Sequence, residues 1–411
     1  MNNDIVMHKR PGPSVVLAST VAFTVLFAVW VIFGIVGVAL KKEWGLSDGQ
    51  FFTLTSVPIL VGSLLRLPVG MLAGRIGGRR FMTGLLLVCA VPMFLLPLAT
   101  GWDQVFALSW AVGLAGVSFA IGNSWIMFWV SPSRQGLALG TFGAGNAGAS
   151  ITKLAAPALI ALPALGIAFL PTGWRLVPTV FGLLLVLTAA FVWLVAPRDR
   201  TDARSLPLSV WLAPLKIPQV WRYGFYYMVF FGAYVALSVT LPKFYVEVYH
   251  TDLVTGGFLT ALFIFPASLL RPLGGWLSDR WGPRVVTLGA FAVVIASSAA
   301  LAFPGLPLVL FVVLTLTLGV GMGTGKASNF KLVAHYYPHE MGVVGGLVGL
   351  LGGLGGWILQ VLFGVTAAQF ASMPFVLLGF GGLASALLFV FWMLRNIRRE
   401  RLAGASAGEA A

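Results

Sequence analysis

The stretch LLRPLGGWLSDRWGPR, Leu269–Arg284, places an arginine, several glycines and a charged turn within an otherwise apolar region. A closely similar stretch, LLRLPVGMLAGRIGGRR, occupies Leu64–Arg80. The two align at an offset of 205 residues, which brings Arg66 and Arg271 into register. The repeat predicts two structurally equivalent halves in one chain, each carrying an arginine at the same depth, as in carriers built from internal repeats.

The composition indicates an integral membrane protein. Of the 411 residues, 59% are hydrophobic and only 9% are charged, and the mean hydropathy is +0.95, values that water-soluble domains do not reach. The basic segment His8–Arg10 precedes an apolar run longer than the roughly 7–15 residues of a signal-peptide core. We therefore expect the first hydrophobic run to be a membrane span.

The hydrophobic pattern predicts an all-α membrane protein. With about 20 apolar residues per span, we expect twelve transmembrane helices, at residues 14–40, 50–73, 81–100, 105–130, 136–161, 176–196, 221–243, 255–277, 284–303, 308–334, 342–368 and 374–396. These helices would form two pseudo-symmetric six-helix bundles, residues 1–196 and 221–396. A cytoplasmic linker, 197–220, would join them, and a cytoplasmic tail, 397–411, would follow.

The formal net charge of +14 is distributed as membrane topology requires, not as on a nucleic-acid-binding surface. With the N-terminus inside, most basic residues fall in cytoplasmic segments. The outer segments then hold only Lys41, Lys42, Arg175 and Lys243. The positive-inside rule therefore places both termini in the cytoplasm. We expect contact with membrane lipid, no nucleic-acid partner and a monomer.

The turn in the opening stretch carries the pattern G-x-x-x-D-R-x-G-x-R, formed by Gly275, Asp279, Arg280, Gly282 and Arg284. This pattern resembles the loop between helices 2 and 3, or 8 and 9, of the major facilitator superfamily. The resemblance implies the major facilitator fold and a gating loop whose charges bind helix ends of the neighbouring bundle in one conformation. In the first half Gly74 replaces the aspartate, so that loop would be weaker or would rest on Arg75, Arg79 and Arg80 alone. Alternatively, these basic loops only set the topology.

Arg66 and Arg271 are charged residues inside predicted spans, about two turns before the cytoplasmic loops. A charge near the bilayer centre costs at least about 2.5–3.5 kcal/mol, so it normally faces a cavity on a transport pathway. All twelve acidic residues lie in tails, loops or helix ends, and none is available to neutralise these arginines. The pair therefore favours an anion taken from solution, and the planar guanidinium suits a planar oxyanion.

Two glycine-rich stretches accompany the arginines. GLALGTFGAGNAGAS begins the predicted fifth helix at Gly136, and GVVGGLVGLLGGLGGW begins the eleventh at Gly342. Gly143 and Gly349 are 206 residues apart, within one residue of the arginine offset. Glycines spaced by three and four residues let helices approach closely, which predicts a narrow pore on both sides of the repeat axis. Ordinary helix packing is the alternative interpretation.

This combination resembles the nitrate/nitrite porter (NarK-type) family of the major facilitator superfamily along the whole membrane region. That family has one arginine on each of helices 2 and 8 and a glycine-rich nitrate signature on each of helices 5 and 11. The first signature matches Gly140, Gly143, Gly145, Asn146 and Gly148. The second matches Gly345, Gly346, Gly349, Gly352, Gly353 and Gly356.

The resemblance implies a substrate site for nitrate and nitrite in which Arg66 and Arg271 grip the anion. A helix-7 tyrosine and phenylalanine, Tyr227 and Phe231, also match the family. Tyr227 would donate a hydrogen bond to the anion, and Phe231 with Phe119 would sandwich it. Asn146 would add an amide donor. Core packing of these aromatic residues is the alternative. The resemblance implies no enzymatic activity, no catalytic or metal-binding residue and no cofactor.

Uptake of nitrate against a negative-inside potential must be coupled, because moving one charge costs about 2.3 kcal/mol per 100 mV. Nitrate/nitrite exchange needs no net charge movement, whereas proton symport needs at least two protons per nitrate. Lys326 and Lys153, inside predicted spans, are candidate coupling groups. The short loops and the GKASNFKLV stretch resemble the symport branch, so we expect proton symport, with antiport as the alternative.

Other interpretations stay open at this point. A carrier of formate, oxalate or a sugar phosphate would share the fold and the paired arginines, and a sensor that binds without transport is a further alternative. A membrane enzyme would need catalytic groups at depth, and the sequence contains no H-E-x-x-H or phosphate-binding loop. We expect an alternating-access carrier in a bacterial cytoplasmic (inner) membrane.

Overall fold

The computed structural model describes residues 12–131, 134–162, 171–199, 212–337 and 341–365, with Ser209 and Leu387. Within these residues the regular structure is entirely helical. Nine described helices are long and apolar enough to cross a membrane, and a tenth is added if one bent pair forms a single span. The protein is therefore an all-α integral membrane protein. The predicted helix 374–396, apart from Leu387, and the tail 397–411 lie outside the described residues.

The helices follow the predicted spans. Those of the first six spans are α1 (Gly12–Trp30), α2 (Phe33–Trp44), α3 (Asp48–Leu64), α4 (Arg66–Ile76), α5 (Gly78–Leu95), α6 (Trp102–Gly113), α7 (Ser118–Trp129), α8 (Gln135–Ala144), α9 (Gly148–Ala161) and α10 (Leu176–Val195). After the predicted linker come α12 (Pro218–Tyr227), α13 (Ala233–Val248), α14 (Leu253–Leu269), α15 (Arg271–Trp281), α16 (Pro283–Leu301), α17 (Leu308–Tyr336) and α18 (Met341–Val365). Helix α12 begins three residues before the predicted start of its span at residue 221, because Pro218 is well suited to a first helical turn.

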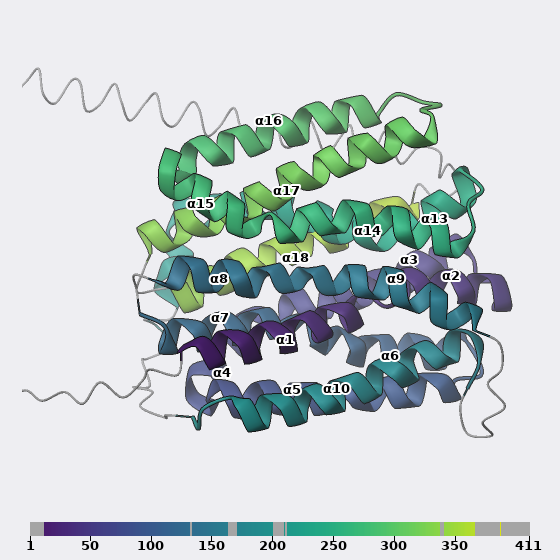
Figure 1. Cartoon of the computed structure of the whole chain (residues 1–411), viewed down its shortest axis with the longest axis horizontal. Helices are drawn as coiled ribbons and strands as arrows, with labels where there is room; N and C mark the ends of the chain where they lie inside the picture. The colour runs from purple at the N-terminus through teal and green to yellow at the C-terminus, as the bar shows by residue number, and fades with distance from the viewer. Residues whose placement is uncertain are drawn as a thin grey trace, which may run out of the picture.

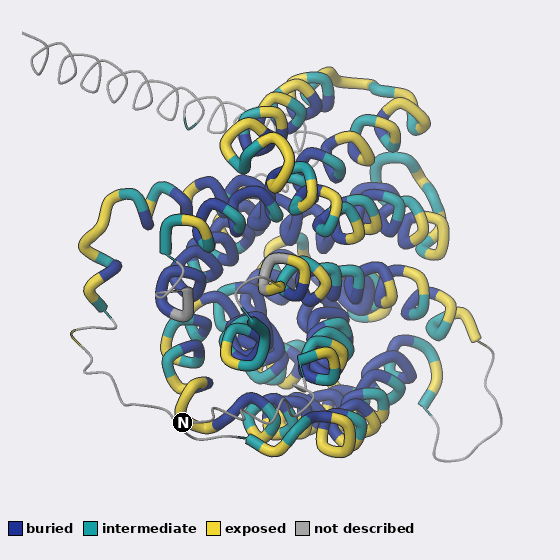
Figure 2. The backbone as a smooth tube through the Cα atoms, turned by 60° about the vertical axis from the view of Figure 1, so that its left-hand side comes forward, coloured by how far each residue is buried: buried dark blue, intermediate teal, exposed yellow. Residues whose placement is uncertain are grey.

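We propose that the chain divides at the linker into a first half, through α10, and a second half, from α12. Figure 1 shows the helices running side by side, with α5 and α10 along one edge and α16 and α17 along the opposite edge. The buried backbone lies between these edges (Figure 2). Following the predicted orientation, we name the end with the turns at Gly77 and Gly282 the inner end, and the opposite end the outer end.

The second and eighth predicted spans are each interrupted at the same place, immediately before the repeated arginines. Helix α3 ends at Leu64 and α4 begins at Arg66, with a bend of 48° between them. Likewise α14 ends at Leu269 and α15 begins at Arg271. Proline has no N–H for the helical hydrogen bond, and Pro68 and Pro272 lie in the first turn after each break. Each arginine therefore opens a new helical segment.

Further irregular turns interrupt the fourth, fifth and seventh predicted spans. They are the 3-10 turns Leu114–Val117 and Gly145–Ala147 and the π-turn Met228–Gly232. Such turns within a helix often mark functional sites, because they redirect side chains and free backbone groups. Here they adjoin the residues that surround Arg66 and Arg271: Gly116 lies in the first turn, Asn146 in the second and Phe231 in the third.

The two halves meet along two seams, each formed by an arginine-bearing helix and a glycine-rich helix. Helix α18 packs on α3 and α4, while α8 and α9 pack on α15 and α14. A Cβ atom added at Gly353 would overlap the Ser63 hydroxyl, and one at Gly143 would lie 2.6 Å from Arg271 Cζ. The glycines are thus required for the seams to be this close.

The signature glycines form two groups, one in which an added Cβ would be crowded and one in which it would fit. Added Cβ atoms would meet Phe23 or Thr24 of α1 at Gly145 and Gly148, and Tyr227 at Gly352. In contrast, added Cβ atoms at Gly140, Gly346 and Gly349 would make only ordinary contacts of 3.5 Å or longer. Gly345 is buried in α18. Close approach therefore accounts for part of each glycine-rich stretch.

A ring of four alternating charges joins the halves at the outer end. Lys41 of α2 lies 2.7 Å from both Asp48 and Glu247, and Lys243 lies 3.0 Å from Asp48 and also pairs with Glu247. The Lys243 side chain is fully buried, over the rings of Phe51 and Phe52. If the halves separate here, each retains a neutral pair, so opening breaks only the two ion pairs that cross the seam.

We expect Glu247→Gln to lower the free energy of unfolding by about 1–3 kcal/mol, because it leaves the buried Lys243 ammonium with one carboxylate. Thermal unfolding in detergent would measure the change. Glu43→Gln is the matched control: Glu43 pairs with Arg175 at the same end, 45% and 33% exposed. That pair should contribute less than about 1 kcal/mol. Equal effects of the two substitutions would contradict a structural role for the ring.

Candidate functional site

Arg66 is almost completely buried at the first residue of α4, with 1% of its surface exposed. Its Nε donates to the Gly116 carbonyl at 3.0 Å, and Nη1 donates to the Gly349 carbonyl of α18 at 2.8 Å. Among the described residues, Nη2 has no hydrogen-bond partner. Because a guanidinium has five N–H donors, Arg66 retains donors for a further acceptor.

Arg271 repeats this arrangement from the other half. It is 3% exposed, and its Nη1 donates to the Gly143 carbonyl of α8 at 3.1 Å. Each arginine therefore crosses to a glycine of the opposite half: Arg66 to Gly349, and Arg271 to Gly143. The sequence predicted both the paired arginines and the paired glycines, but not the hydrogen bonds that connect them crosswise.

The electrostatic environment of the two arginines favours an anion. None of the six ion pairs among the described residues includes either one. Both arginines also begin helical segments, α4 and α15, whose N-terminal peptide dipoles add positive potential. Interrupted membrane helices present such N-termini to anionic substrates. A small anion would therefore supply the negative charge that the described protein groups do not.

Aromatic rings enclose the Arg66 guanidinium. Its Cζ lies 5.0 Å from the ring centroid of Trp30, 5.5 Å from that of Phe119 and 5.1 Å from that of Phe231. The rings of Phe119 and Phe231 are nearly parallel, with centroids 6.4 Å apart and 20° between their planes. A flat group between two rings needs roughly 7 Å, twice the optimal carbon contact distance. A planar anion would thus require only a small separation of these rings.

Two predicted donors, Tyr227 and Asn146, are fully buried near the arginines. The Tyr227 hydroxyl and both side-chain polar atoms of Asn146 have no hydrogen-bond partner among the described residues. Tyr227 stacks on Phe231, with centroids 5.0 Å apart. Leaving buried polar groups unpaired costs about 1–3 kcal/mol each, so these donors indicate a site that is completed by a ligand.

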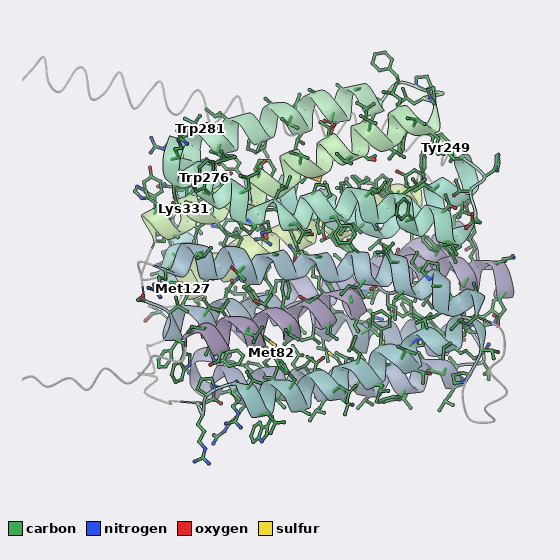
Figure 3. All side chains as sticks on the ribbon, viewed as in Figure 1. Met82, Met127, Tyr249, Trp276, Trp281 and Lys331 are labelled. Atoms are coloured by element: carbon green, nitrogen blue, oxygen red, sulfur yellow. The ribbon has the colours of Figure 1, made fainter. Side chains whose placement is uncertain are left out.

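A cavity of about 200 Å³ leads from Arg271 toward the inner end. Phe119 and Phe330 line it near the arginine, and Asp279 and Lys331 line it farther in. Phe330 contacts Phe119 and Tyr227 edge to face, with centroid distances of 5.5 and 4.9 Å. Figure 3 places Lys331 and Trp276 at the same end of the molecule, opposite Tyr249. The cavity connects the candidate site to the inner end.

The two candidate coupling lysines, Lys326 and Lys153, are fully buried but have different surroundings. The Lys326 ammonium lies 3.4 Å from the centre of the Tyr234 ring and has no hydrogen-bond partner among the described residues. Tyr234 in turn donates to the Asn146 carbonyl at 3.0 Å and lies 3.0 Å from Ser268 Oγ. Lys326 is thereby connected to the candidate site. Lys153 donates instead to the Val31 carbonyl, 3.1 Å away, where α1 ends.

At the inner end, the turn of the second half makes contacts within its own half. Asp279 pairs with Lys331 at 2.5 Å, and Arg284 donates to the Tyr336 hydroxyl. The Arg280 guanidinium lies over the Trp276 ring, 5.6 Å from its centroid. Gly275 lines the cavity with open space beside it. The resemblance implied contacts with the neighbouring bundle in one state, and this conformation does not show them among these residues.

The turn of the first half has a carboxylate that the sequence comparison missed. Asp199, just after α10, accepts hydrogen bonds from the backbone N–H groups of Arg79 and Arg80, at 2.9 and 3.0 Å. It thus caps α5 at its N-terminus, where a carboxylate is favoured. The expectation for this turn considered only Arg75, Arg79 and Arg80 and did not include this carboxylate. Proximity in the fold, not position in the repeat, supplies the acid.

Two further residues around the site, Phe330 and Tyr234, were not among the predicted site residues. No motif marks them, because buried aromatic residues are common throughout the chain, which contains 31 phenylalanines and 14 tryptophans. A weak signal was available for Tyr234: it lies seven residues after Tyr227, two turns along the same helix.

Comparisons with known proteins agree with this architecture. The chain matches the Major Facilitator Superfamily over residues 18–359 and, in a second overlapping match, 257–409. It is 43% identical over 401 residues to a protein named "Probable nitrate/nitrite antiporter NarK1" of Thermus thermophilus, covering 92% of this chain and 88% of that protein. It is 31% identical to the "Nitrite extrusion protein" of Bacillus subtilis, covering 89% and 91%.

A solved structure shows the same fold. A bacterial homologue of the human lysosomal transporter Spinster superposes with a TM-score of 0.72, at 18% identity, over 93% of this chain and 97% of that one. Family members are transporters, and the chain is not an enzyme. From the repeated arginines, the glycine seams and these similarities, the chain belongs to the nitrate/nitrite porter (NarK-type) family of the major facilitator superfamily.

Proposed function

We propose that the protein is a secondary active transporter of nitrate, and of nitrite, that works by alternating access in a bacterial cytoplasmic membrane with both termini inside. The observation that carries this proposal is the pair of buried arginines, each donating across the seam to a glycine carbonyl, with no carboxylate partner among the described residues. The names of the relatives as nitrate and nitrite transporters support the choice of anion.

The geometry supports a small planar anion in particular. The remaining Arg66 donors, Tyr227 and Asn146 can donate to its oxygens, and the near-parallel rings of Phe119 and Phe231 match its flat faces. Nitrate and nitrite are both planar, whereas a sugar phosphate is too large for rings 6.4 Å apart. Formate is also small and planar, so competition between anions distinguishes it from nitrate.

Alternating access would use the two seams as sliding surfaces. The cavity reaches the arginine level from the inner end, while the ring of Lys41, Asp48, Lys243 and Glu247 joins the halves at the outer end. This arrangement supports an inward-facing conformation. Because the arginine hydrogen bonds cross the seams, an anion that replaces a glycine carbonyl as acceptor would change the contact between the halves. Binding and rearrangement would then be linked.

For coupling, proton symport through Lys326 is the mechanism that we propose, with nitrate/nitrite exchange as the alternative. A buried ammonium without a carboxylate is costly, and a bound anion would lower the cost of protonating it. Lys326 lies against Tyr234, whose hydroxyl contacts Asn146 of the candidate site. Lys153, with its carbonyl partner, is less suited to this role.

Replacing either Arg66 or Arg271 by lysine should reduce nitrate uptake at least tenfold. An ammonium keeps the charge but not the planar fork, and a lost hydrogen bond to a charged group is worth about 1.5–3 kcal/mol. Uptake of labelled nitrate into proteoliposomes measures the effect, and Arg175→Lys at the exposed outer end is the matched control. Undiminished uptake by either variant would contradict the assignment of the site. In a separate competition experiment with the wild type, stronger inhibition by formate than by nitrite would identify formate as the better substrate.

Alanine at Gly352 should impair transport more than stability. Its Cβ would overlap the Tyr227 ring and lie 3.3 Å from the Phe231 ring, so those rings must move from the candidate site. Overpacking of this kind costs about 1–3 kcal/mol, which thermal unfolding would detect. Gly84→Ala in α5 is the control, because nothing lies within 4 Å of the added Cβ. If the variant loses much stability but each folded molecule transports nitrate as fast as the wild type, Gly352 serves only helix packing.

Lys326→Gln should abolish uptake driven by a proton gradient while leaving nitrate/nitrite exchange measurable. Proteoliposomes with an imposed pH gradient, with and without internal nitrite, separate the two modes. Lys216→Gln, at an exposed position, controls for the loss of a lysine charge. If the wild-type protein takes up nitrate only with internal nitrite, and independently of pH, proton symport is wrong. If Lys326→Gln retains gradient-driven uptake, the proton moves elsewhere.

A further inference from the structure

Lys153 is a buried cation whose hydrogen bond could be made without a charge. Its ammonium donates to the Val31 carbonyl, in the break between α1 and α2. A lysine ammonium has three donors, and among the described residues the Val31 carbonyl is its one hydrogen-bond partner. No described carboxylate pairs with it. One backbone carbonyl thus provides partial compensation for a full positive charge.

The internal repeat shows what this position requires structurally. Val31 corresponds to Ala236, at the same offset of 205 residues as the arginines, and the Ala236 carbonyl accepts a hydrogen bond from Gln360 at 2.8 Å. Gln360 lies on the glycine-rich helix of the other half, 207 residues after Lys153, which is two residues more than the arginine offset and one more than the glycine offset. In α18 a neutral amide therefore donates the hydrogen bond to a backbone carbonyl that the Lys153 ammonium donates in α9.

The comparison of Lys153 with Gln360 shows that the hydrogen bond to the carbonyl does not need a positive charge. Removing an ammonium from water costs several kcal/mol even after relaxation, whereas an amide makes the same bond at much lower cost. Gln360 also bonds Thr240 and Thr55, so it is fully engaged. The positive charge of Lys153 is thus not needed for the contact itself, and a charged residue within a membrane span usually serves a transport pathway.

The location of Lys153 fits such a pathway on the outer side. A Cβ added at Gly34 of α2 would lie 2.8 Å from Lys153 Nζ and 2.9 Å from the Val239 carbonyl oxygen of α13. The ammonium therefore lies where the first half meets the second. Val239 is one helical turn before Lys243 of the outer charge ring. Separation of α2 from α13 at that ring would uncover Lys153.

We propose that Lys153 is an outer relay site for a small inorganic oxyanion. Its ammonium binds the entering anion after the outer ends of α2 and α13 separate, and the anion then passes inward to Arg66 and Arg271. This inference rests on the proposed transport function. Closure of the ring returns Lys153 to the Val31 carbonyl, so the relay site is present only when the outer side is open.

The test compares the two sides of the membrane. Nitrate transport is measured in right-side-out and inside-out vesicles containing the full-length protein, which gives separate KM values for outer and inner nitrate. Lys153→Gln retains the hydrogen bond and removes the charge. We expect it to raise the outer KM roughly tenfold, as for loss of one charge-assisted contact, and to leave the inner KM unchanged. Lys153→Arg keeps the charge and should keep the outer KM near the wild-type value.

Two measurements control for folding and for surface charge. Lys153→Gln should unfold thermally near the wild type, whereas Lys153→Met, without the hydrogen bond, should unfold at a lower temperature. Lys42→Gln removes an exposed lysine from the same end and should change neither KM. An unchanged outer KM in Lys153→Gln, or equal increases on both sides, would overturn the relay site. Absence of nitrate transport in the wild type would instead overturn the proposed function.

Discussion

Two buried guanidinium groups, each donating to a glycine carbonyl of the opposite half, are the interaction on which the rest of this structure depends. Arg66 bonds Gly349 and Arg271 bonds Gly143. The carbonyl dipoles offset only part of each positive charge, so the arginines remain able to bind an anion. The same bonds also join the two halves, so the substrate site and the sliding surface share their atoms.

The glycines follow from this interaction. At Gly143 the bare backbone gives the arginine room, because a Cβ there would lie 2.6 Å from the Arg271 guanidinium carbon. At Gly349 a Cβ would make only ordinary contacts with Arg66. The helix breaks before Arg66 and Arg271 have a related effect, since they place each arginine at the positive end of a new segment. Arginine, glycine and proline therefore act together at each seam.

Among the described residues, positive side chains are paired with carboxylates at the outer end of the molecule but not in its interior. At the outer end, Lys41 and Lys243 are neutralised by Asp48 and Glu247 in a ring that can divide into two neutral pairs. None of the ion pairs among the described residues includes Arg66, Arg271, Lys153 or Lys326. Carboxylates thus hold the closing surfaces together, while the interior is left positive and suited to a mobile anion.

Hydrophobic run lengths and the internal repeat suffice to predict the helical membrane fold, the paired arginines and the paired glycine stretches, because these features depend on composition and spacing along one chain. The crosswise hydrogen bonds, the aromatic enclosure by Trp30 and Phe330, and the cap that Asp199 provides could not be predicted in this way. They join residues from separate helices, whose rotation and depth are set by packing. The same reason applies to Lys153 and Gln360. The repeat brings them only to within two residues of register, and the fold alone shows that a charge and a neutral amide bind equivalent carbonyls.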